Sequence, residues 1–130
     1  MENHKLFEIS QSAIIQDSAG RILILKKNKK WLLPGGRLEE NETWLEGLQR
    51  EVEEEAGIEK FSIKKILDID TSDDKNTYIA TFLCKVEDVQ VKLSSEHQEY
   101  VWLNLKDIDK YEFWHEKIKD RLKILLGASQ

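Results

Sequence analysis

Glutamate side chains are crowded into one segment of the chain, and this crowding is the first sign of chemistry. Between positions 36 and 58 there are eight glutamates and two arginines, which makes the segment more acidic than the whole 130-residue chain, whose net charge is −5. Such a segment either faces open solvent or holds cations. Because Mg²⁺ prefers oxygen ligands and shares carboxylates with substrate phosphates, the segment is a candidate site for metal-assisted chemistry on phosphates.

A helix is predicted to carry most of these glutamates. Thr43 and Glu46 match the S/T-x-x-E capping box, and Gly57 stands where a glycine ends many helices, so the limits are roughly 43 to 56. At 100° per residue, one apolar stripe faces the core, and it consists of Trp44, Leu45, Leu48, Val52 and Ala56. The glutamates at 46 and 53 are predicted to face water.

Three further carboxylates, those of Glu51, Glu54 and Glu55, are predicted to share an arc beside the apolar stripe. Their like-charge pairs at i,i+3 and i,i+4 cost a few tenths of a kcal/mol each. The helix dipole adds roughly 0.3–1 kcal/mol for each anion in the last turn. A divalent cation would remove this conflict, whereas the alternative is a solvated acidic helix face.

The segment from 36 to 58 resembles the Nudix box. That family's pattern is Gly, five residues, Glu, seven residues, then Arg-Glu-aliphatic-x-Glu-Glu-x-Gly-aliphatic, and every specified position is met, ending in REVEEEAGI at 50–58. At average residue usage a chance match is on the order of 10⁻⁸ per chain. The stretch Trp31-Leu32-Leu33-Pro34-Gly35-Gly36 resembles the family's usual entry to the box, and the similarity covers nearly the whole chain.

The resemblance implies a single Nudix domain over residues 1–130 with an α/β fold, classed as α+β in some schemes: an α/β/α sandwich around a mixed sheet. It implies Mg²⁺-dependent hydrolysis, with Mn²⁺ as a substitute, of a pyrophosphate bond in a nucleoside diphosphate linked to another moiety. A nucleoside triphosphate or a dinucleoside polyphosphate is the favoured substrate. The alternative is a non-catalytic nucleotide-sensing or regulatory module.

The resemblance also implies roles for individual residues. The catalytic residues would be Glu51, Glu54, Glu55 and Glu96, and the metal ligands would be these four carboxylates together with the carbonyl of Gly35. Glu42 and Arg50 would form a structural ion pair that ties the loop to the helix. Gly47 departs from the alanine common in the family, and it either leaves room for the metal cluster or permits close packing.

Outside the box, residues 93–103 are similar to a segment of the diadenosine-tetraphosphate hydrolases. Glu96 matches that segment's carboxylate best, with Glu99 in reserve, so the general base stays open among Glu51, Glu96 and Glu99. His97 is expected to be a bystander, and Trp102 is expected to lie in the core. The lysines of 26–30 either steer polyphosphate or end a solvated hairpin, and Trp114 and His115 are candidates for the rim of the substrate cleft.

The elements that must position these residues can be placed from composition. Strands are predicted at 7–15, 22–25, 61–69, 78–86, 89–93 and 100–103, and the first two are expected to form a hairpin. Pro34-Gly35-Gly36 is predicted to stop regular structure in a bent loop. A helix lying on the sheet is predicted within 113–126, where Trp114, Ile118, Leu122 and Leu125 follow helical spacing.

Composition excludes several other classes of protein. The lone Cys84 rules out an intrachain disulfide and an all-cysteine zinc site, and a pI near 5.3 makes nucleic acid an unlikely partner. With no long apolar run, no membrane partner and a cytoplasmic location are expected. The expected partner is a small nucleotide. The aromatic residues at 111–114 would suit a homodimer or cover the sheet.

Overall fold

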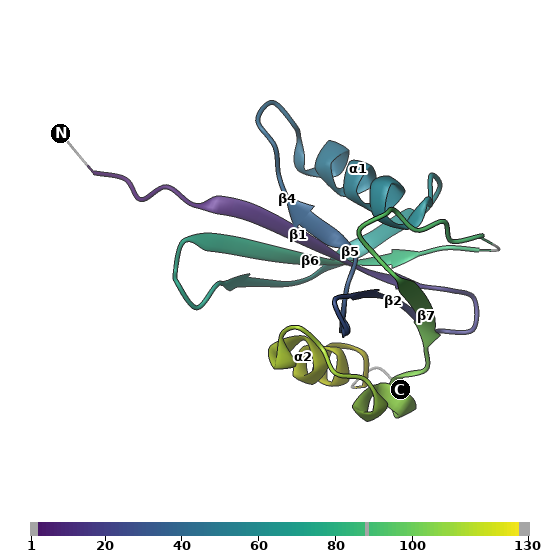
Figure 1. The fold of residues 1–130 in the computed structure, drawn as a ribbon. Helices are drawn as coiled ribbons and strands as arrows, with labels where there is room; N and C mark the ends of the chain where they lie inside the picture. Colours follow the sequence, from purple (N-terminus) through teal and green to yellow (C-terminus); the bar gives the residue numbers. More distant parts are fainter. Residues whose placement is uncertain (1–2, 88, 128–130) are drawn as a thin grey trace.

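The computed structural model of the protein describes residues 3–87 and 89–127, which fold into one sheet with a helix on each face (Figure 1). The strands are β1 (Glu8–Gln16), β2 (Ile22–Lys27), β3 (Lys30–Leu32), β4 (Gly35–Arg37), β5 (Ser62–Thr71), β6 (Thr77–Lys85) and β7 (Glu99–Leu103). The helices are α1 (Trp44–Ala56), the 3₁₀ helix η1 (Leu105–Lys110) and α2 (Glu116–Gly127). The predicted α/β/α sandwich is confirmed.

The sheet is mixed, as expected, and β1 is at its centre. β1 pairs in parallel with β6 along its whole length and antiparallel with β4 over three residues. It meets β2 only where Gln16 faces Ile22. The predicted hairpin therefore forms at its turn, where Asp17 accepts hydrogen bonds from two backbone amides, but its strands then separate and β4 takes the place beside β1.

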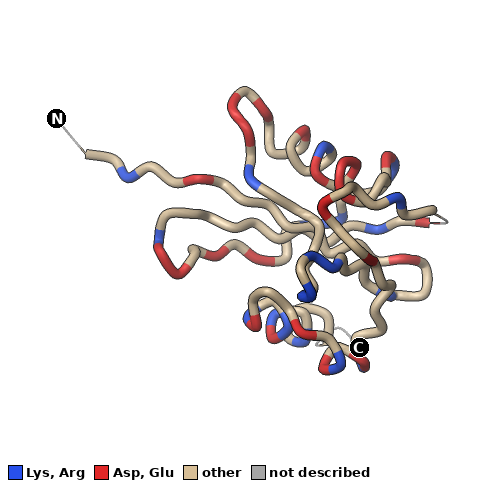
Figure 2. The backbone as a smooth tube through the Cα atoms, viewed as in Figure 1, with Lys and Arg blue, Asp and Glu red and all other residues tan. Residues whose placement is uncertain are grey.

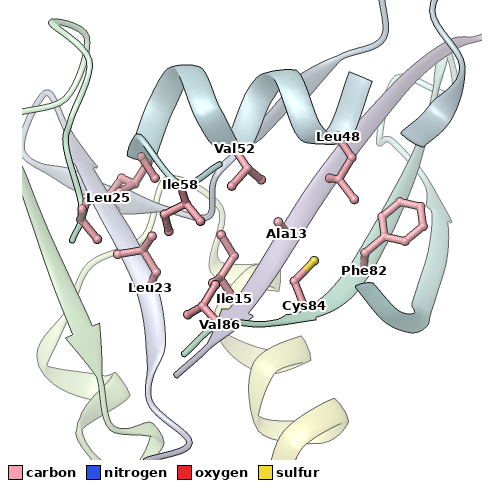
Figure 3. Close-up of a cluster of buried hydrophobic side chains, with 12 residues drawn as sticks. Ala13, Ile15, Leu23, Leu25, Leu48, Val52, Ile58, Phe82, Cys84 and Val86 are labelled. Carbon is pink, nitrogen blue, oxygen red and sulfur yellow. The ribbon is translucent and has the colours of Figure 1, made fainter. Parts of the chain in front are cut away.

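Two hydrophobic cores lie on opposite faces of the sheet because β1 and β2 bury both of their faces. Under α1, Leu48 and Val52 pack on alternate residues of β1 and β2 and on Phe82 and Cys84 of β6 (Figure 3). Under α2, Leu122 packs on the intervening residues of the same strands. Each helix is therefore anchored by a fully buried leucine.

Three local predictions were wrong. Residues 89–93 form no strand, because the backbone N–H of Lys92 donates to the carbonyl of Ala56 at the end of α1 instead of to a strand. Residues 35–37 form strand β4 beside β1 instead of an irregular loop. In the C-terminal helix, Trp114 precedes the first turn and Leu126, in place of Leu125, is the buried residue of the last turn.

The aromatic residues near 111–114 mostly cover the protein's own sheet. Phe113 is buried, and Tyr111 packs edge-on against Trp31. Trp114 remains partly exposed, although its indole N–H donates to the carbonyl of Lys27 at 2.8 Å. The homodimer stays a prediction. In the described part of the chain, no helix has the length and apolar character needed to cross a membrane.

Candidate active site

Helix α1 begins and ends where the sequence predicts. The Thr43 hydroxyl accepts from the backbone N–H of Glu46 at 3.2 Å, and the Glu46 carboxylate accepts from the backbone N–H of Thr43 at 2.9 Å. Gly57 ends the helix in the left-handed conformation, with φ of 68°. These local interactions define the two ends of α1, and acidic residues cluster on α1 and on the loop before it (Figure 2).

Glu55 is the most buried of the box glutamates, with 8% of its surface exposed. Both of its carboxylate oxygens lie 3.3 Å from the backbone nitrogen of Gly35, which donates to them. Burial raises the pKa of Glu55 to about 8, and the nearby charges of Glu51 and Glu96 act in the same direction. The positive charge of Lys27 and the Gly35 hydrogen bond only partly oppose this rise.

Glu51 lies directly behind β4. Its side chain is 14% exposed, and burial raises its pKa. A Cβ atom at Gly36 would lie 2.6 Å from the Glu51 carboxyl carbon, so only glycine lets strand and carboxylate approach so closely. At Gly35 a Cβ atom would lie 2.1 Å from the carbonyl oxygen of Gln11. The two glycines therefore allow β4 to lie close to β1 on one side and to the Glu51 carboxylate on the other.

Arg50 binds the predicted partner Glu42 and several further carboxylates. Its Nε lies 2.6 Å from Glu42 Oε2 and its Nη2 lies 3.0 Å from Glu42 Oε1, which is a bidentate pair. The pair lowers the pKa of Glu42. The remaining nitrogen, Nη1, lies 2.9 Å from Glu51 Oε1 and 3.3 Å from Glu54 Oε2. Glu54 itself is 61% exposed.

The loop that carries Glu96 is attached to the C-terminal end of α1. The backbone N–H of Ser94 donates to the carbonyl of Glu55, and the Ser94 hydroxyl lies 3.2 Å from Nδ1 of His97. His97 is buried, and desolvation lowers its pKa. Glu96 is exposed on this turn, and its charge acts on both Glu55 and His97. The loop thus brings a fourth carboxylate to the box.

Glu99 is placed differently. It forms an ion pair with Lys26 at 3.0 Å, and on β7 it lies on the same face as Val101 and Leu103, which pack in the core under α2. The box glutamates belong to α1 on the opposite face. Trp102, with the other parity, packs against the core under α1 as expected.

A cavity of about 520 Å³ opens beside β4, and we call it the glycine-side cavity. Its lining includes Ser10, Lys27, Gly35, Gly36, Trp114 and His115. Trp114 and His115 therefore do border a cavity next to the box, as expected for a cleft rim. A second cavity of about 500 Å³ shares Ser10 and His115 and continues between β5, β6 and α2.

The residues present suit a hard divalent cation. Glu51, Glu54 and Glu55 offer only oxygen donors, and a cation would remove the cost of keeping two buried carboxylates of raised pKa close together. In the described conformation, however, no three His, Cys, Asp or Glu side chains of residues 3–87 and 89–127 already converge on one point. The carboxylates of Glu51 and Glu54 instead contact Arg50, and that of Glu55 accepts from the backbone N–H of Gly35.

Sequence analysis missed one polar side chain of this region, that of Gln11, and left the reason for Gly47 open. Gln11 is a buried polar residue of β1 whose amide donates to the carbonyl of Trp44 at 3.0 Å, and its only signal is a glutamine within an apolar strand. For Gly47, a Cβ atom would lie 2.5 Å from Leu38 and 3.1 Å from Gln11, so close packing explains this glycine. Asn41 adopts the left-handed conformation, with φ of 66°.

Comparisons with known proteins agree with this geometry. A family model described as NUDIX domain matches residues 6–122. The asymmetrical bis(5'-nucleosyl)-tetraphosphatase of Sus scrofa is 33% identical over 104 residues, which cover 72% of this chain and 70% of that protein. The 8-oxo-dGDP phosphatase NUDT18 of Danio rerio is 48% identical over 60 residues, or 42% of this chain, but the match spans only 18% of that protein's length.

The fold has solved relatives as well. The crystal structure of the MutT protein from Methanosarcina mazei Go1 superposes with a TM-score of 0.78 at 28% identity, and the match covers 99% of each chain. The family model spans most of the chain, and Gly36, the first residue of the box, lines the glycine-side cavity next to Glu51. The chain therefore belongs to the NUDIX domain family and is a Nudix hydrolase.

Proposed function

We propose that this chain acts as a single domain that hydrolyses a pyrophosphate bond of a small nucleotide with the help of Mg²⁺, which Mn²⁺ can replace. One observation carries the proposal: the glycines of β4 line the cavity on one side and contact the carboxylates of Glu51 and Glu55 on the other. A polyphosphate lying on β4 would meet these carboxylates, while the nucleoside occupies the cavity.

The metal ligands in this proposal are the carboxylates of Glu51, Glu54, Glu55 and Glu96 and the carbonyl of Gly35. A bound Mg²⁺ supplies positive charge that offsets the charge of the phosphates as the bond breaks. The bidentate pair of Arg50 with Glu42 holds the loop before α1 against the helix. Lys27, whose charge acts on Glu55, lines the glycine-side cavity and adds a further positive charge for the phosphates.

Glu51 is our candidate for the group that orients or deprotonates the attacking water. Its side chain is only 14% exposed and lies against Gly36 of β4, the strand on which we place the polyphosphate. Glu96 is the second candidate, because it belongs to the loop attached to the same end of α1. Glu99 is not proposed, because it pairs with Lys26 on the other face of the sheet.

A nucleoside triphosphate or a dinucleoside polyphosphate is the proposed substrate class. The similarity of a tetraphosphatase over most of this chain supports the second of these. The two adjoining cavities, with Trp114 at the border of the first, offer more room than one phosphate group needs.

The test is the release of phosphate or pyrophosphate from nucleoside triphosphates, dinucleoside polyphosphates and nucleotide sugars, with Mg²⁺ and with EDTA. Metal-dependent turnover concentrated on one group of compounds supports the proposal and names the substrate class.

The variant E54Q should lose turnover by orders of magnitude with its fold intact, because it removes a metal ligand. The matched control is E53Q, which neutralises an exposed neighbour on the same helix and should keep turnover. Nucleotide binding without turnover on any compound would instead indicate a regulatory module.

A further inference from the structure

The guanidinium of Arg50 contacts carboxylates of the loop before α1 and carboxylates of α1 itself. Nε and Nη2 form the short fork on Glu42, which lies in the loop before α1. Nη1 faces the other way, at 2.9 Å from Glu51, 3.3 Å from Glu54 and 3.5 Å from Glu39. One side of the group therefore holds the loop, and the other side holds two of the proposed metal ligands.

The carboxylates of Glu51, Glu54 and Glu55, the three proposed metal ligands on α1, do not point at a common centre. Glu51 and Glu54 turn toward Arg50, while Glu55 turns toward the backbone N–H of Gly35. No three metal-binding side chains converge anywhere in the described ranges 3–87 and 89–127. Bringing these three glutamates onto one cation requires Glu51 and Glu54 to exchange Nη1 for that cation.

We propose that Nη1 of Arg50 is an internal counter-cation that holds Glu51 and Glu54 when no divalent cation is bound and releases them when one binds, while the Nε and Nη2 fork stays on Glu42. This inference rests on the proposed function, because it takes the box glutamates as the metal ligands. Arg50 is thus a positioning residue that acts through the carboxylates.

The chemistry of arginine suits this exchange. A guanidinium stays charged at every accessible pH, so the stand-in charge cannot be lost by deprotonation. The fork is bidentate and charge-assisted, which makes it the stronger of the two attachments. Nη1 makes only a single contact with each of Glu51 and Glu54, at 2.9 and 3.3 Å, and Glu54 is largely exposed, so these are the contacts that a divalent cation can displace.

The exchange has a measurable consequence for affinity. A cation that must displace Nη1, and then lies near its charge, binds less tightly than it would without Arg50. Replacing Arg50 by Gln should therefore tighten Mg²⁺ binding by roughly three- to tenfold, the range expected for one partly screened charge. The same variant should unfold at a lower temperature without metal, because the glutamates lose their counter-charge and the loop loses its fork.

The first experiment follows the Nη resonances of Arg50 in wild-type protein labelled with ¹⁵N-arginine during titration with Mg²⁺ alone. The inference expects the Nη1 signals to move to values typical of a solvent-exposed guanidinium, with the same midpoint as metal binding by calorimetry, while the Nε signal stays unchanged. Saturation with Mg²⁺ that leaves Nη1 hydrogen-bonded would overturn the inference. This measurement needs no variant to fold.

The second experiment compares Mg²⁺ dissociation constants by calorimetry for wild type, R50Q and R37Q. Arg37 is the matched control, because it is also an arginine close to the box and follows Gly36 directly. Its side chain pairs with Glu8, and among the described residues it shows no contact with a box glutamate. R37Q should change the dissociation constant less than twofold. Tighter binding in R50Q alone supports the inference, whereas weaker binding in R50Q means that Arg50 only supports the loop and overturns it.

The two proposals fail in different ways. Wild-type protein that binds no Mg²⁺ overturns the proposed metal site and this inference together. Protein that binds Mg²⁺ with the expected release of Nη1 but hydrolyses nothing contradicts the proposed function and leaves the exchange supported. Protein that hydrolyses nucleotides while Nη1 of Arg50 remains hydrogen-bonded to Glu51 and Glu54 contradicts the exchange and leaves the proposed function supported.

Discussion

The two main helices of this protein place their charges in opposite ways. On α1, three glutamates gather near the C-terminal end, where the dipole disfavours anions, and no basic residue lies in the last turn. On α2, basic side chains reach acidic partners on other elements: Arg121 binds Asp68 and Asp70 of β5, and Lys123 binds Asp109 of η1. Each helix nonetheless covers its own hydrophobic core.

We interpret the ion pairs of α2 as stabilising the fold and the clustered glutamates of α1 as belonging to a functional site. The ion pairs of α2 bring opposite charges together at modest benefit and hold the helix against β5. The α1 glutamates oppose one another, and two of them have raised pKa values. Where a fold keeps like charges together at a cost in stability, an incoming cation is the natural compensation.

The largest expected effect comes from neutralising one of the α1 carboxylates. E51Q should lower kcat by roughly 100-fold or more, since the metal and its ligands supply several kcal/mol of transition-state stabilisation. The same change should raise the melting temperature in EDTA, because it removes a partly buried negative charge. Steady-state kinetics and calorimetry in EDTA measure both effects. A variant with wild-type turnover, or with a lower melting temperature, would break the contrast between the helices.

The next effect tests whether the two cores matter equally. Leu48 under α1 and Leu122 under α2 are both fully buried, so replacing either by Ala should lower the free energy of unfolding by about 2–5 kcal/mol. Urea denaturation measures the two values. A loss below about 1 kcal/mol for L122A alone would show that α2 is held mainly by its ion pairs and not by packing.

The pH dependence of stability should have opposite signs in the two regions. Burial raises the pKa of Glu55 to about 8, so the folded state binds this proton more tightly than the unfolded chain does. In EDTA, the Glu55 contribution therefore declines as pH rises toward 8. For Asp70, hydrogen bonds from the Thr71 backbone and from Arg121 lower the pKa, so its contribution is lost as pH falls through the acid range.

Melting temperatures in EDTA across the pH range check these signs. E55Q should remove part of the decline toward alkaline pH, whereas D70N should remove part of the loss at acid pH. The comparison would be contradicted if E55Q left the alkaline limb as steep as in wild type.

The smallest expected effect comes from the ion pairs of α2. R121Q should lower the free energy of unfolding by about 0.5–1 kcal/mol, because its two aspartate partners are only partly buried. K123Q, whose pair with Asp109 is more exposed, is the matched control and should cost less. Urea denaturation at low and high salt separates the two. An increase in stability for R121Q would mean that α2 also keeps its charges at a cost.

The structure departs from the sequence-based expectations where distant residues compete for the same backbone groups. The composition of 89–93 predicts a strand, but the backbone N–H of Lys92 donates to the carbonyl of Ala56 at the end of α1. Pro34 and two glycines predict a loop, yet β1 pairs with Gly35 and Gly36 because their missing side chains allow close approach. Neither competition is visible in local composition.

In the candidate site, too, some features follow from local sequence and others depend on residues far apart in the chain. The caps of α1 and the 3.6-residue period are local, so the sequence alone determines which glutamates share a face. The pair of Arg50 with Glu42 was expected only from the resemblance of the box, because Glu42 lies in the loop before the helix. The opposite placement of Glu96 and Glu99 depends on how their segment docks on α1 and pairs with β2, which involves residues far away in the chain.

The sequence by itself therefore determined the helix that carries the box, because capping and short-range periodicity encode it, and the match to the box motif indicated the family and its carboxylates. The tertiary structure alone decided that the glycines of β4 separate a cavity from Glu51, that Nη1 of Arg50 contacts both Glu51 and Glu54, and that two cavities adjoin under α2. These features arise where strands and helices from separate parts of the chain meet, and no local pattern records such meetings.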